Sequence, residues 1–185
     1  MKGIYKDYFP IVWKRSTFPT AGDYVLTATY KNQLVFVKPE VDNDTLTFPE
    51  TWININLGQQ TELIEDSDSA TISFTNPTSG AGDKYIKVIN KTPTPQTIGV
   101  GFDNGSSLPH ILLVFDEIGS MYNVTAQFNP TLKAYITEDY QENSVLRGAI
   151  QTPVVWKQNL AALEETSNWK LERDPVSGQY SITTA

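Results

Sequence analysis

The chain contains no cysteine and only one histidine among its 185 residues. The absence of cysteine excludes disulfides, thiolate nucleophiles and zinc sites with cysteine ligands. A single histidine, His110, excludes metal sites built on several imidazoles, and it would have to be the base of any serine–histidine triad. Because His110 opens the most apolar segment of the chain, we interpret it as a structural or surface residue. We name no catalytic residue.

Long apolar runs and an excess of basic residues are also absent. No stretch of about 18 apolar residues is present, so we expect no membrane-spanning segment. No apolar run follows the N-terminal lysines, which predicts no signal peptide. The net charge is −7, with 14 Lys and Arg against 21 Asp and Glu. Nucleic acid is therefore not an expected partner. We expect a soluble cytoplasmic protein, with secretion by a non-standard route left open.

What the chain does contain is alternation of apolar and polar residues with a period of two, clearest between His110 and Tyr140. An unbroken apolar run at 110–115 is followed by alternating segments at 120–128 and 132–137. Turn residues separate the three segments. We predict three consecutive antiparallel strands at the centre of a β-sandwich. The side chains predicted to lie in the core are Leu112, Val114, Tyr122, Val124, Phe128 and Ile136.

Strand patterns separated by turn signals recur about every 8–12 residues through the rest of the chain. We predict a hairpin that pairs 24–30 with 34–37, and a closing hairpin that pairs 169–173 with 180–184. An acidic loop is expected from Pro39 to Asp44. The only helical pattern is short, at about 158–165. The predicted fold class is all-β: an antiparallel sandwich of jelly-roll or immunoglobulin-like type.

The domain organisation is predicted to be simple. Residues 1–22 are rich in aromatic side chains and contain two prolines, so we expect an N-terminal arm that packs on the domain. Residues 23–185 show no internal repeat and no linker, and we expect one sandwich domain there.

The most suggestive candidate site is Trp52-Ile-Asn-Ile-Asn56. In a strand, Ile53, Ile55 and Leu57 would face the core and leave Trp52, Asn54 and Asn56 in a row on the opposite face. An indole offers a stacking surface, and two amides offer donors and acceptors for hydroxyl groups. These three residues are the predicted ligand-binding site.

Carboxylates supply two further hypotheses. Asp42 and Asp44, and likewise Asp66 and Asp68, have a spacing that suits calcium, but neither loop has an EF-hand pattern, so we predict no metal site and no cofactor. A glycosidase needs only two carboxylates in a cleft. The candidates for such a pair are Asp116, Glu117, Glu138, Asp139 and Glu142.

We therefore expect a non-catalytic, lectin-like protein that binds a glycan or other neutral polar ligand. The alternative is a structural protein that acts through oligomeric contacts, for example as a homo-oligomer whose aromatic arm docks on a neighbour. A carboxylate-dependent hydrolase is the third hypothesis. An exposed Trp52 would favour the ligand-binding protein, and a large apolar symmetric contact would favour the structural protein. A deep pocket with paired carboxylates would favour the hydrolase.

Overall fold

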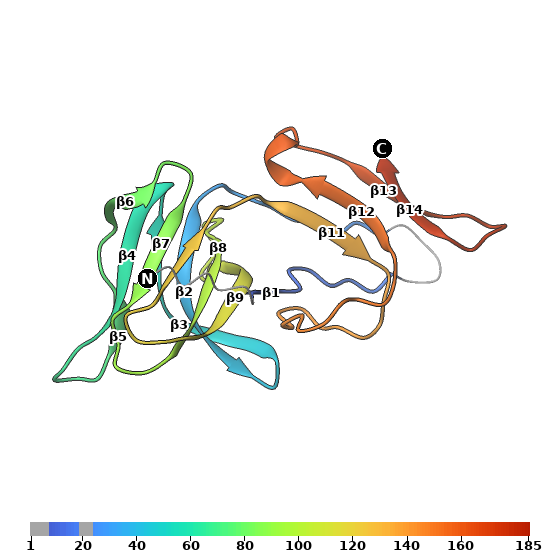
Figure 1. Ribbon diagram of the computed structural model, residues 1–185. Coiled ribbons are helices and arrows are strands. Elements are labelled where there is room, and N and C mark those ends of the chain that lie inside the picture. Colours follow the sequence, from blue (N-terminus) through green and yellow to red (C-terminus); the bar gives the residue numbers. More distant parts are fainter. Residues whose placement is uncertain (1–7, 19–23) are drawn as a thin grey trace. The chain divides into compact units, whose positions relative to one another are not determined.

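The computed structural model describes residues 8–18 and 24–185, which form fourteen strands and one short helix (Figure 1). The strands are β1 (Tyr8–Pro10), β2 (Leu34–Asp42), β3 (Thr45–Ile55), β4 (Gly58–Glu65), β5 (Ile72–Phe74), β6 (Thr78–Gly82), β7 (Ile86–Asn90), β8 (Gln96–Phe102), β9 (His110–Ile118), β10 (Asn123–Ala126), β11 (Thr131–Tyr135), β12 (Val154–Asn159), β13 (Trp169–Arg173) and β14 (Tyr180–Thr184). All strand pairs are antiparallel except β4 with β7. The predicted all-β class is confirmed.

The chain divides into two compact units. The first contains the residues up to Phe128 together with 141–147, and the second contains 129–140 and 148–185. The predicted single domain over 23–185 stays a prediction. Of the predicted N-terminal arm, residues 1–7 and 19–22 lie outside the described residues.

A five-stranded sheet with the order β1-β9-β8-β2-β3 forms one layer of the first unit. Strands β2 and β3 are joined directly at Asn43 and Asp44, whose φ angles of 47° and 57° are those of a two-residue hairpin turn of type I′. The pairing continues to the turn, where Asp42 lies opposite Thr45. The predicted acidic loop from Pro39 to Asp44 is therefore wrong, because most of it is strand.

A second sheet of the same unit has the order β10-β7-β4-β5, with β6 also paired to β4. One apolar cluster contains residues of both sheets, so the sheets pack on a shared core as in a β-sandwich. Period-two alternation explains most of its membership, since every second residue of a strand faces the same side. Phe115 and Ile118 of β9 are three residues apart, and the pairing of β8 with β9 shifts register between them. The buried members are Leu34, Phe36, Ile55, Ile98, Val100, Phe115 and Ile118 from the first sheet, and Leu63, Ile86, Val88 and Val124 from the second.

A smaller cluster joins three separate parts of the first unit. Ile11, just after β1, packs with Leu46 of β3, Val114 of β9 and Val145 of the returning segment 141–147. Nearby along the chain, the Trp13 ring meets Phe102 edge-on, with 5.4 Å between ring centroids. Residues 8–13 are therefore held by strand pairing and by burial of apolar side chains.

Replacing Val124 with alanine should lower the free energy of unfolding by about 1–3 kcal/mol, through lost burial and a cavity. Val124 is only 2% exposed and belongs to the core shared by both sheets. Val176 is 95% exposed, so Val176→Ala is the matched control, with an expected change within about 0.5 kcal/mol. Denaturant unfolding measures the stability of both variants. Equal midpoints for the two variants would show that β10 is not part of the core.

The second unit consists of two antiparallel pairs, β11 with β12 and β13 with β14. The closing hairpin is confirmed, and Trp169 lies opposite Thr184. The Trp156 and Trp169 rings meet edge-on at 5.1 Å. No residue of this unit is fully buried. The predicted helix at 158–165 is corrected to a single 3₁₀ turn at Leu160–Ala162, where the Asn159 side chain accepts a hydrogen bond from the Ala161 N–H.

Three further predictions about strands and core are wrong. The segments expected as three adjacent strands belong to different sheets: β9 to the first, β10 to the second, and β11 to the second unit. Tyr122 and Ile136 are exposed, whereas Val114 and Val124 are buried as predicted. Residues 24–30 form no strand, because β8 and β3 already occupy both sides of β2.

Candidate functional site

The edge strand β3 carries the predicted ligand-binding residues. Trp52 lies opposite Val37 and Asn54 opposite Val35 in a stretch of regular pairing, so both side chains lie on one face of the sheet. Trp52 is 40% exposed, and Asn54 is exposed as well. Ile55 is buried on the other face, as the alternation predicts.

Asn56 lies just beyond the end of β3 and is also exposed. Its backbone N–H donates to Gln59 Oε1 at 2.8 Å, which fixes the turn into β4. Leu57, expected to face the core with Ile53 and Ile55, is exposed instead. The row of three polar and aromatic positions therefore consists of two strand positions and one turn position.

A carboxylate that sequence reasoning missed lies beside Asn54. Asn54 Nδ2 donates to Asp103 Oδ2 at 3.5 Å. Asp103 follows β8, and its position is fixed by two bonds: its N–H donates to Gln33 O at 2.8 Å, and its Oδ1 accepts from the Gly105 N–H at 2.7 Å. In the sequence, Asp103-Asn-Gly105 has only the pattern of a turn. Its proximity to Asn54 follows from the pairing of β2 with both β3 and β8.

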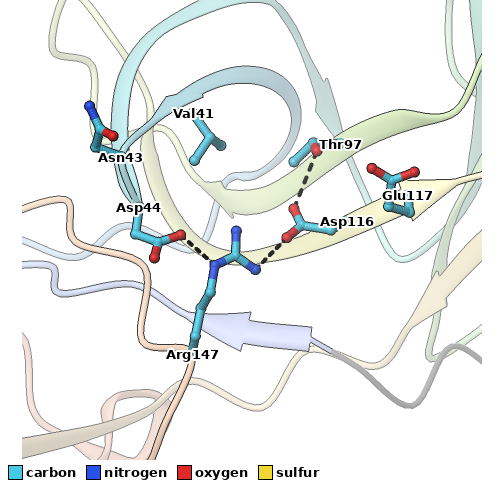
Figure 2. A pocket seen from close by; sticks show the side chains of 7 residues that line it. All are labelled: Val41, Asn43, Asp44, Thr97, Asp116, Glu117 and Arg147. Carbon is cyan, nitrogen blue, oxygen red and sulfur yellow. Dashed lines mark hydrogen bonds and ion pairs between the residues drawn. The ribbon is translucent and has the colours of Figure 1, made fainter.

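A polar hollow of about 400 Å³ lies elsewhere in the first unit (Figure 2). Arg147 lies between two carboxylates there: its Nε donates to Asp44 and its Nη1 to Asp116 Oδ2 at 2.6 Å. Thr97 Oγ1 donates to Asp116 Oδ1 at 3.2 Å. The hydrogen bond to Asp44, followed by that to Asp116, raises the pKa of Arg147. The residues lining the hollow are Val41, Asn43, Asp44, Thr97, Asp116, Glu117 and Arg147.

This arrangement is best explained as an anchor. Arg147 connects the β2–β3 turn and β9 to the segment 141–147, and its guanidinium also lies 4.8 Å from the centre of the Phe9 ring. Both oxygens of Asp116 are engaged, one by Arg147 and one by Thr97. Among the other carboxylates considered for hydrolysis, Glu142 lies 3.8 Å from Lys14 Nζ, and Asp139 accepts a hydrogen bond from Thr137.

His110 packs among aromatic rings. Its ring centroid lies 5.1 Å from that of Phe102 and 6.1 Å from that of Trp13. Its Nε2 is 2.9 Å from Asn104 Nδ2. Burial lowers the pKa of His110, and the charge of Lys14 acts in the same direction. These contacts give His110 a structural role at the start of β9.

The acidic loops considered for calcium have local structural roles. The first is the tight turn between β2 and β3. In the second, Asp66 Oδ1 accepts hydrogen bonds from the N–H groups of Ser69 and Asp68 and from the Ser69 hydroxyl. These bonds, led by that from the Ser69 N–H, lower the pKa of Asp66. Within residues 8–18 and 24–185, no three His, Asp or Glu side chains gather to hold a metal ion.

Comparisons with known proteins found no match: no family model, no curated protein and no solved structure matches the chain. The part of the chain that the structure describes also has no helix that is long and apolar enough to span a bilayer.

Proposed function

We propose that the protein is a non-catalytic binding protein for a glycan or a similar neutral polar ligand, and that the ligand binds at the exposed face of β3. The observation that carries the proposal is the exposed Trp52 indole on the same strand face as Asn54, which is hydrogen-bonded to Asp103. An indole can stack on the apolar face of a sugar ring. Amide and carboxylate groups can pair with its hydroxyls.

The charge of the protein supports a neutral ligand. The chain carries a net charge of −7, and a surface of that sign repels anions. Near the site, the amine of Lys38 is neutralised by Glu50 at 2.6 Å. The cytoplasmic location expected from the sequence stays a prediction.

A structural protein that acts through oligomeric contacts is the second candidate. The supporting observation lies in the second unit, which has no fully buried residue and exposes Ile136, Val154 and Tyr180. Burial of exposed apolar side chains of this kind against another surface would stabilise a complex. The third hypothesis, a carboxylate-dependent hydrolase, stays a prediction, and the engagement of both Asp116 oxygens gives it no support.

A glycan array combined with size-exclusion light scattering separates the first two candidates. Selective binding of neutral glycans by a protein that scatters as a monomer supports the binding function. A stable oligomer that binds no glycan on the array would favour the structural role and contradict our proposal.

Replacing Trp52 with alanine should weaken binding of the best array glycan by about 1–3 kcal/mol, or about 5- to 150-fold, the loss expected for an aromatic anchor. Its effect on the melting temperature should be small, because Trp52 is substantially exposed. Tyr85→Ala is the matched control, since Tyr85 is 42% exposed and precedes β7 in the other sheet. Unfolding of the Trp52 variant, or equal binding by both variants, would contradict the assignment of Trp52.

A further inference from the structure

Asp103 forms a hydrogen bond with Asn54, one of the proposed binding residues. Within the part of the chain that the structure describes, its carboxylate is the one charged group that does so. Its Oδ1 and its backbone N–H are both fixed by backbone groups, so the carboxylate is held in place before any ligand arrives. Its Oδ2 makes only the long contact of 3.5 Å with Asn54. A contact at that distance is weak, so a ligand hydroxyl can replace it at little cost.

The chemistry of the pair restricts the ligand. An ionised carboxylate only accepts hydrogen bonds, so Asp103 requires a donor, whereas the Asn54 amide offers both a donor and an acceptor. Two hydroxyl groups on neighbouring carbon atoms can meet both side chains at once. An anionic group placed there would face the negative charge of Asp103, and such a juxtaposition of like charges disfavours anionic ligands.

We infer that Asp103 is a specificity-determining residue of this site, and that the ligand class is uncharged glycans that present neighbouring free hydroxyl groups, with sialylated and uronic-acid glycans rejected. This inference rests on the proposed function. It adds to that proposal a residue outside the predicted row and a selection against acidic sugars.

The test compares wild type with Asp103→Asn on an array that carries neutral, sialylated and uronic-acid glycans. Asparagine keeps an Oδ1 acceptor for the Gly105 N–H but removes the charge. Binding of neutral glycans should weaken about 10-fold or more, as expected for loss of a hydrogen bond to a charged group. The discrimination against acidic glycans should shrink in the same variant. Asp83→Asn removes one negative charge from an exposed loop and should change neither property.

The outcomes separate the inference from the proposed function. Glycan binding that weakens in Trp52→Ala but not in Asp103→Asn would keep the proposed function and overturn the inference. A preference of the wild-type protein for acidic glycans that disappears in Lys31→Met would also overturn the inference. It would show that the Lys31 amine, which lies near Gly105, attracts anionic ligands. An array without any bound glycan would overturn both. If Asp103→Asn melts early, Asp103→Ser supplies a smaller acceptor, and the same loss of neutral-glycan binding is expected.

Discussion

Replacing Gly101 with alanine is expected to lower the free energy of unfolding by about 3–5 kcal/mol, near the upper end of single-substitution effects. A Cβ on Gly101 would lie 1.8 Å from the carbonyl oxygen of His110 and 2.9 Å from the Cα of Ile111. Both atoms belong to the backbone of β9, so no side-chain rotation relieves the clash. The pairing of β8 with β9 shifts register between Val100 and Gly101, where the two strands come close.

Gly148→Ala is the control, because a Cβ on Gly148 would meet no atom within 4 Å. That variant should stay within about 0.5 kcal/mol of wild type. Denaturant unfolding, monitored by tryptophan fluorescence, measures both. If Gly101→Ala were as stable as Gly148→Ala, this would show that the β8 and β9 backbones do not approach each other closely at Gly101.

The second large effect is expected at Asn90, whose side chain is fully buried at the end of β7. Its Nδ2 donates to Ile118 O at 2.7 Å and to Thr94 O at 2.9 Å, and its Oδ1 accepts from the N–H and the hydroxyl of Thr92. Asn90→Ala removes all four bonds, so the Thr92 N–H and Ile118 O lose their side-chain partner, whereas the Thr92 hydroxyl can still donate to Thr94 O at 2.9 Å. We expect a loss of about 3–5 kcal/mol, since each unsatisfied buried group costs about 1–3 kcal/mol.

Asn90→Asp distinguishes hydrogen bonding from packing, because aspartate has nearly the same shape. A carboxylate would place an oxygen against two carbonyl oxygens in a buried site, so the loss should be at least as large as for alanine. Exposed Asn129 provides the control Asn129→Ala, with no expected effect on the melting temperature. An Asn90→Asp variant as stable as wild type would show that the network around Asn90 is not formed.

The closing hairpin could be predicted from the sequence because its determinants are local. Asp174 and Gly178 bound the turn, where Asp174 Oδ1 accepts hydrogen bonds from the N–H groups of Val176 and Ser177 and Gly178 adopts a φ of 71°. Alternation on both sides then sets the register. The Asn43–Asp44 turn carries a comparable local signal, but the acidic side chains around it are equally typical of an open loop.

Partner strands could not be predicted in the same way. Alternation around β9, β10 and β11 predicts strands but contains no information on which sheet each one joins. Residues 24–30 alternate equally well, yet both edges of β2 are occupied by other strands. A strand requires a free partner edge, and that condition depends on the whole topology.

The same distinction between local patterns and long-range contacts applies to the candidate site. Exposure of Trp52 and Asn54 followed from their alternation with the buried Ile55. Asp103 and Arg147 contact residues far away in the chain, Asn54 in one case and Asp44 and Asp116 in the other. No local pattern marks such contacts, so both were missed.

The most direct test of the proposed function is the ¹⁵N–¹H spectrum of the protein during titration with the best neutral glycan from the array. The four tryptophans should give four indole N–H signals, and Trp52→Ala identifies one of them by its loss. We predict that the Trp52 signal and the side-chain amide signals of Asn54 move in a saturable way while the signal of buried Trp13 stays in place. Movement confined to the signals of Trp156 and Trp169, or no movement at all, would contradict binding at β3.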